Sequence, residues 1–209
     1  MRLSSLEELR TVYRQPSGGA VDKVIDRLDR HCAEFLAASP FFVLATAGAD
    51  GVCDASPKGG APGFVRVLDE HRLAWPDLSG NNRLDSFENL VANAHVGLLF
   101  VIPGMDETLR VNGRAELSTD PELCAALDVG GKPAKVAVVV HVAEAYVHCS
   151  KAFRRAALWS PETWPAATER PSAACMLRDH VAIDVAASVI DDALEQDARD
   201  TLWQPAGDV

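Results

Sequence analysis

The feature that most restricts the fold of this 209-residue chain is a central series of strand-like runs separated by turn residues. The runs cover residues 41–47, 52–56, 64–68, 72–75, 96–102, 108–117 and 135–147. A helical period interrupts them at 84–93, and Asp120 and Pro121 start one further short helix. The βαβ alternation of a Rossmann sheet is absent. We therefore predict a mainly β (α+β) domain with flanking helices, in which about six antiparallel strands close into a small barrel.

Helical patterns flank this region on both sides. Ser4 and Ser5 are each followed three residues later by a glutamate, which is a capping-box pattern. Apolar residues recur at helical spacing from Val21 to Leu36, so we predict one continuous second helix there. Further helices are predicted at 149–159, 173–178 and 185–203.

The length allows one well-buried domain with helical appendages. We predict an N-terminal helical segment (1–40), a β-barrel domain (41–159) and a C-terminal helical extension (160–209).

The formal net charge of −10 argues against partners that need a basic surface, namely nucleic acids and anionic membranes. No apolar run is long enough to cross a bilayer. The five cysteines are scattered and show no C-x-x-C spacing, which is typical of reduced thiols. We expect a cytoplasmic protein, and no spacing of side chains predicts a metal site.

A polar loop leads into the central helix. Gly80 and Asn82 precede Arg83 at the point where the helical period begins. Backbone N–H groups, amide side chains and a guanidinium at the positive end of a helix dipole suit a phosphate or another small anion. The alternative is a surface ion pair between Arg83 and Asp85 or Glu88. We favour the ligand role, because an arginine ahead of a helix is unfavourable to the dipole by itself.

Five segments, in this order, resemble the pyridoxamine 5′-phosphate oxidase-like family of FMN-binding split barrels. They are DASPKG at 54–59, GFVRVL at 63–68, GNNRLDS at 80–86, RVNGRA at 110–115 and HCSKAFRRAALW at 148–159. The resemblance covers about residues 41–159. It implies a six-stranded antiparallel split β-barrel of the FMN-binding type, and a homodimer with FMN at the interface.

The resemblance also implies which residues would bind FMN. Arg66 occupies the position of the family's strand arginine, and Asn82 and Arg83 occupy the position of its loop contacts. The other implied contacts are Ser56, Lys58, Val67, Leu68, Trp75, Pro76, Asp77, Arg154 and Trp159, the last two supplied by the other subunit. The residues alone allow an alternative, in which the side chain of Arg66 points from its strand into solvent.

The chain departs from true pyridoxamine-phosphate oxidases where these bind their substrate. Asp69, Glu70 and His71 stand where the family has a lysine, and the tail lacks the family's R-x-H-x-R-type element. Two carboxylates there would repel a substrate phosphate. We therefore predict an FMN-dependent oxidase or reductase of another small organic molecule, with no assigned general acid or base. The alternatives are an F420-dependent reductase and a non-catalytic flavin- or haem-binding stress protein.

Other polar residues of the strands have structural interpretations. His95 and His141 lie in apolar runs and are predicted to be buried. Arg110 and Arg114 share one strand face, which is either an exposed sheet surface or part of the dimer interface or flavin edge.

Overall fold

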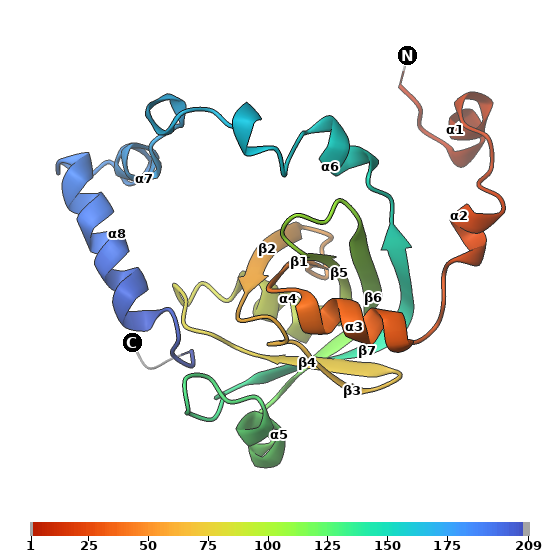
Figure 1. Cartoon of the computed structure of the whole chain (residues 1–209), viewed down its shortest axis with the longest axis horizontal. Coiled ribbons are helices and arrows are strands. Elements are labelled where there is room, and N and C mark those ends of the chain that lie inside the picture. Colours follow the sequence, from red (N-terminus) through yellow and green to blue (C-terminus); the bar gives the residue numbers. More distant parts are fainter. Residues whose placement is uncertain (1, 207–209) are drawn as a thin grey trace.

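The computed structural model describes residues 2–206; Met1 and residues 207–209, the ends of the two predicted terminal segments, lie outside it. One antiparallel sheet curls into a barrel at the centre of the molecule (Figure 1). In sheet order its strands are β2 (Cys53–Gly59), β1 (Phe41–Ala47), β5 (His95–Val101), β6 (Thr108–Ser118), β7 (Ala137–His148), β4 (Arg72–Pro76) and β3 (Arg66–Asp69).

The predicted count of six strands is wrong, because the sheet has seven. The edge hairpin supplies two of them: β3 pairs with β4, and β4 pairs with β7. Within residues 2–206, the edge strands β2 and β3 are not hydrogen-bonded to each other, so the barrel is split rather than closed. The architecture is a mainly antiparallel sheet with flanking helices, as the sequence predicts.

Alternation along the strands turns every second side chain into the barrel. Phe42 and Leu44 of β1 are fully buried there, and Phe42 meets Trp75 edge to face with ring centroids 5.0 Å apart. The helix α4 (Asp85–Ala92) adds Phe87 and Leu90 to the same core. Side chains fill the barrel, so a ligand has to bind outside it.

The prediction of one helix from Val21 to Leu36 is wrong. The N-terminal helices are α1 (Leu6–Val12), α2 (Gly19–Asp22) and α3 (Arg30–Ala38). The carboxylate of Asp29 accepts a hydrogen bond from the N–H of Cys32 at 2.8 Å and so caps α3. Before this cap the chain makes a short β-bridge, in which Ile25 pairs with Ala145 of β7.

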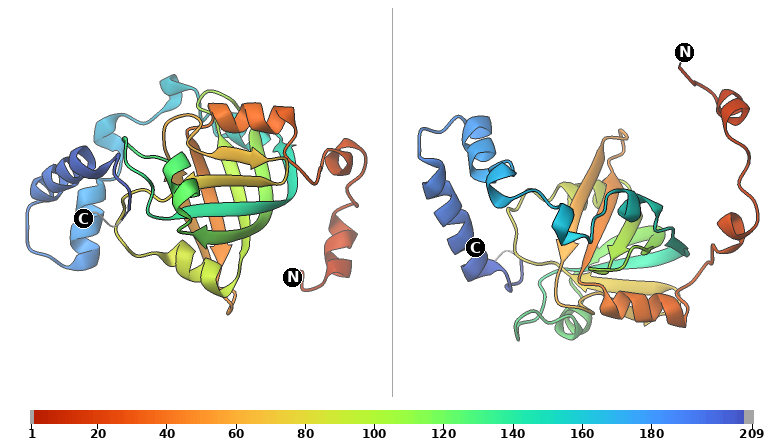
Figure 2. Two further views of the ribbon diagram at one scale, coloured as in Figure 1. Left: turned by 90° about the horizontal axis from the view of Figure 1, so that it is seen from below. Right: turned by 45° about the horizontal axis from the view of Figure 1, so that its top comes forward.

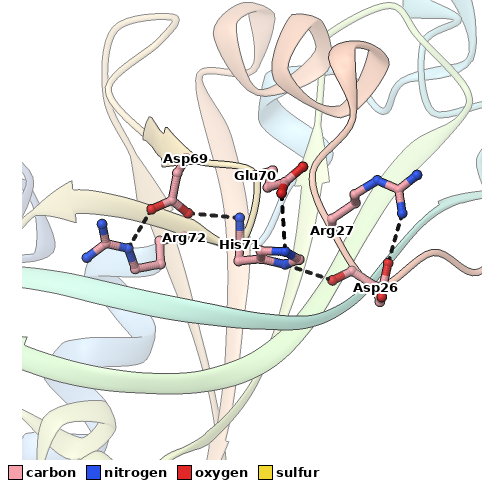
Figure 3. A network of polar contacts seen from close by, with 6 residues as sticks. All are labelled: Asp26, Arg27, Asp69, Glu70, His71 and Arg72. Atoms are coloured by element: carbon pink, nitrogen blue, oxygen red, sulfur yellow. Dashed lines mark hydrogen bonds and ion pairs between the residues drawn. The ribbon is translucent and has the colours of Figure 1, made fainter.

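Polar contacts fasten this segment to the turn between β3 and β4 (Figure 3). The ring nitrogen Nδ1 of His71 lies 3.3 Å from the carbonyl oxygen of Asp26. The N–H of Leu28 donates to the carbonyl of Glu70 at 2.7 Å, and the N–H of His71 donates to the Asp69 carboxylate at 2.9 Å. Glu70 and His71 therefore hold the N-terminal segment on the barrel, while the Asp69 carboxylate orders the turn itself.

The remaining helices lie between β6 and β7 and after the sheet. They are α5 (Pro121–Ala126), α6 (Lys151–Arg155), α7 (Ala173–Val181) and α8 (Ala187–Thr201). The helix predicted at 149–159 is shorter than expected, and Ala157 beyond it is left-handed, with a φ of 46°. α7 and α8 lie on the side of the barrel away from α1 and α2 (Figure 2). No helix among residues 2–206 is long and apolar enough to span a membrane.

The prediction that His95 and His141 are buried is wrong, because both lie on the exposed face of the sheet. Nε2 of His95 lies 3.1 Å from Nη1 of Arg114, and Nε2 of His141 lies 3.5 Å from Oε1 of Glu116. Each histidine thus belongs to the polar outer face that carries Arg114. All five cysteines are free.

Candidate functional site

A cleft lies between one edge of the barrel and α8. It consists of two adjoining pockets of about 270 and 390 Å³, called here the first and second pockets. Both are lined by Lys58, Asp77, Leu78 and Gly80. The loop after β4 and the start of α4 line the first pocket, and α8 lines the second. A third pocket of about 240 Å³ adjoins the second.

Eight of the twelve predicted cofactor contacts line these pockets. The first pocket is lined by Ser56, Asn82 and Arg83, and the second by Trp75. Lys58 and Asp77 line both the first and the second pocket. Pro76 lines the second and third pockets, and Arg66 lines the third. Trp75 is only 2% exposed, so its indole ring belongs to the core rather than to a ligand surface. Arg66 and Arg83 line different pockets, the third and the first, and Leu78 lines both of these.

The other four predicted contacts lie outside the three pockets. Val67 and Leu68 follow Arg66 on β3 and are partly exposed. Nε of Arg154 donates to Oδ2 of Asp106 at 3.0 Å, and the indole N–H of Trp159 donates to the carbonyl of Met105 at 2.9 Å. Arg154 and Trp159 are therefore fixed to the loop between β5 and β6, away from this chain's own cleft.

The loop before α4 has a backbone that few residues adopt. Asn82 and Leu84 are left-handed, with φ of 54° and 59°, and a leucine in that conformation is strained. Leu84 is the N-cap of α4 but has no side-chain hydrogen bond to the first turn. Nε of Arg83 donates to Oδ2 of Asp85 at 2.8 Å, and both side chains are substantially exposed. The surface ion pair considered from the sequence is thus present, and pairs so exposed to water are weak.

A hydrogen-bonded group joins β2 to α4, and two of its members, Ser56 and Ser86, line the first pocket. The hydroxyl of the buried Ser86 donates to Oδ2 of Asp54 at 2.6 Å, and the hydroxyl of Ser56 donates to the same oxygen at 2.8 Å. The bond from Ser86, aided by Ser56 and the charge of Lys58, holds the pKa of Asp54 below its usual value, against the opposing effect of burial. Asp54 is therefore a negative charge in the vicinity of Lys58.

Lys58 and Asp77 are half-buried charges that line both pockets of the cleft. Burial raises the pKa of Asp77, and the charge of Lys58 partly opposes this. Within residues 2–206 neither side chain has a hydrogen-bond or ion-pair partner; Nζ of Lys58 lies 5.8 Å from the centre of the Phe87 ring. Half-buried charges that lack direct partners are typical of sites that bind ligands.

Sequence reasoning missed the wall that α8 provides. Asp197, Ala198, Thr201 and Leu202 line the second pocket. Residues 203–206, called here the C-terminal clip, attach this helix to the barrel: the N–H of Ser79 donates to the carbonyl of Gln204 at 2.9 Å, and Leu78 pairs with the buried Pro205. No pattern in the sequence of α8 indicates which part of the barrel it faces.

Asp69 and Glu70, expected from the sequence to repel a substrate phosphate, do not line any of the three pockets. They lie in the turn of the β3–β4 hairpin, at the end opposite Arg66 and Pro76. Among residues 2–206, no three His, Cys, Asp or Glu side chains are grouped so that they could hold a metal ion.

Comparison with known proteins gives one family match. The sequence model described as pyridoxamine 5′-phosphate oxidase matches residues 28–149. No curated protein matches the chain. Similar solved structures include a variant of HupZ from Group A Streptococcus (17% identity, 58% of this chain and 99% of that chain, TM-score 0.47). Another is a protein assigned as a pyridoxamine 5′-phosphate oxidase from Lactobacillus delbrueckii (20% identity, 58% of this chain and 99% of that chain, TM-score 0.44). A third is an F420 reductase (21% identity, 54% of this chain and 94% of that chain, TM-score 0.40).

Proposed function

The chain belongs to the pyridoxamine 5′-phosphate oxidase family, and from this premise we propose that it is an FMN-dependent oxidoreductase of a small organic molecule. The observation that carries the proposal is the cleft beside β2, where the half-buried Lys58 and the strained loop before α4 line the same pocket. Together the first and second pockets reach the size of cofactor sites, roughly 300–1,000 Å³.

The first pocket fits the phosphate of FMN. The amide of Asn82, the guanidinium of Arg83 and the uncapped N-terminus of α4 offer donors on one side of it. Because the ion pair between Arg83 and Asp85 is exposed, a phosphate can compete for the guanidinium. Lys58 adds a second positive charge, and Arg66 would reach the cofactor from the third pocket. Bound FMN would supply the redox chemistry, while these residues bind and orient it.

We also propose a homodimer with the cofactor at its interface. Arg154 and Trp159, which lie away from this chain's own cleft, would serve the cleft of the second copy. The terminal helices support an interface: α1 and α2 contain no buried residue, and Leu6 and Val12 are 77% and 61% exposed. Apolar side chains that are exposed in one copy of a chain are common where a second protein surface covers them.

The substrate is proposed to differ from pyridoxamine 5′-phosphate. The family's basic tail element is missing, and the C-terminal helix presents Asp197 to the cleft instead. A carboxylate in that position disfavours a phosphorylated substrate. A cytoplasmic location, without nucleic-acid or membrane partners, is part of the same proposal and agrees with the net charge of −10.

The absorption spectrum of the purified protein and the mass of the ligand released on denaturation test the proposal. We expect flavin bands, the mass of FMN, bleaching by NAD(P)H, and recovery of the colour when an electron acceptor is added. A deazaflavin would identify an F420-dependent reductase, and a Soret band would identify a haem binder. Bound FMN that never cycles would indicate a non-catalytic flavoprotein. A colourless protein that takes up no FMN contradicts the proposal.

A further inference from the structure

The second pocket has one wall that does not come from the barrel. Asp197, Ala198, Thr201 and Leu202 are spaced so that they share one face of α8, and this face lines the pocket. Across from it lie Lys58 and Asp77, together with the apolar side chains of Phe64, Pro76 and Leu78. A ligand held here would lie on an apolar surface between charged groups from two separate parts of the chain.

Negative charge dominates this pocket once a cofactor phosphate has engaged Lys58. Within residues 2–206, the carboxylates of Asp77 and Asp197 have no hydrogen-bond or ion-pair partner, and Lys58 is the one cation among the residues that line the second pocket. Both carboxylates therefore remain available to a ligand. The half-buried position of Asp77 strengthens its interaction with an opposite charge, because the local dielectric is lower than that of water.

The rest of α8 adds to the same field. The helix carries five carboxylates (Asp191, Asp192, Glu195, Asp197 and Asp200) against one arginine (Arg199), a net charge of −4. Clefts lined by charge of one sign attract small ions of the opposite sign.

We propose that the second pocket binds a small organic cation with an apolar body, such as an aromatic amine, whose charged group lies between Asp77 and Asp197. Asp197 is then a specificity-determining residue supplied by the C-terminal helix, and its carboxylate takes no part in bond making. The inference rests on the proposed function in one respect only, namely that the phosphate of the cofactor pairs with Lys58. Anionic molecules of the same shape would leave both carboxylates unpaired beside a negative charge.

Benzylamine and benzoate have similar shapes and opposite charges, and they test the proposal by isothermal titration of the full-length protein loaded with FMN. We expect benzylamine to bind about tenfold more tightly than benzoate. Asp197→Asn should weaken benzylamine binding by about three- to tenfold, and Asp77→Asn should do so in the same direction. Asp192→Asn is the matched control, because it removes the same charge from α8 at a residue that does not line the pocket.

Benzoate binding as tightly as benzylamine, or no binding of either molecule, would overturn the proposal. So would equal losses in Asp197→Asn and Asp192→Asn. FMN content is measured on the same samples, and the titration is repeated without added FMN. A protein that binds no FMN but prefers benzylamine refutes the proposed function alone, whereas an FMN-loaded protein without that preference refutes the cation site alone.

Discussion

Replacing Arg83 by alanine should weaken FMN binding by an amount that the structure bounds. A hydrogen bond between charged groups contributes about 1.5–3 kcal/mol. To bind a phosphate, Arg83 must give up part of its ion pair with Asp85, in which the side chains are 72% and 46% exposed. Such exposed pairs contribute at most about 1 kcal/mol. The net loss in Arg83→Ala is therefore about 0.5–3 kcal/mol, which raises the Kd for FMN about 2- to 150-fold.

The assay is a fluorescence titration of FMN with the apoprotein. Arg72→Ala is the matched control: Nε of Arg72 lies 2.7 Å from Oδ2 of Asp69, and the two side chains are 48% and 42% exposed. This pair resembles that of Arg83 and Asp85 but lies at the far end of the β3–β4 hairpin. Arg72→Ala should leave the affinity for FMN unchanged. An Arg83→Ala variant that binds FMN as tightly as the wild type would show that the loop before α4 does not hold the phosphate.

Three further predictions concern the walls of the cleft. Ser86→Ala removes a buried hydrogen bond to Asp54 and should lower the free energy of unfolding by about 1–2 kcal/mol in urea denaturation. Burial raises the pKa of Asp77 above the usual aspartate pKa of 3.8. Ionisation of this carboxylate therefore lowers the free energy of unfolding as the pH rises above 3.8. Asp77→Asn should therefore raise the Tm at neutral pH, a gain that disappears below 3.8. A Cβ at Gly130 would lie 2.8 Å from a carbonyl oxygen of the C-terminal clip. Gly130→Ala should therefore displace the clip that attaches α8 to the barrel and speed proteolysis of α8. Gly131→Ala, also at positive φ but with open space around it, should not.

The strands could be predicted because each carries its own signal. Turn residues at 49–51 separate β1 from β2, and a helical period identifies α4 between β4 and β5. β2 continues through Pro57 to Gly59, beyond the strand-like run predicted at 52–56. Proline is tolerated there because β2 is an edge strand, which needs no partner for every N–H group. The sequence does not reveal which strands lie at the edges, since that depends on pairing between distant residues.

The error at residues 21–36 has a different cause. The apolar spacing there fits a helix, but backbone pairing of Ile25 with Ala145 holds part of this segment in a β-bridge. Asp29 then starts α3 afresh as its N-cap. Local propensity was overridden by a contact between residues far apart in the sequence.

Long-range contact also explains which part of the cleft could be predicted. Ser56, Lys58, Asn82 and Arg83 lie in segments with recognisable local patterns, and the fold brings them to one pocket. Asp197 and Lys58 line the same pocket, and the C-terminal clip that follows α8 pairs with the loop after β4. Three of the seven strands, β5, β6 and β7, lie along the chain between Asp77 and Asp197, and no spacing rule links the two aspartates.

The two sides of the cleft come from different parts of the chain. The side that holds Lys58 and Arg83 lies within the region matched by the family, residues 28–149, and is built on the barrel. The side that holds Asp197 lies beyond that region and depends on the C-terminal clip. If the first side binds the cofactor and the second selects the substrate, changes on α8 should alter ligand preference while FMN affinity stays constant.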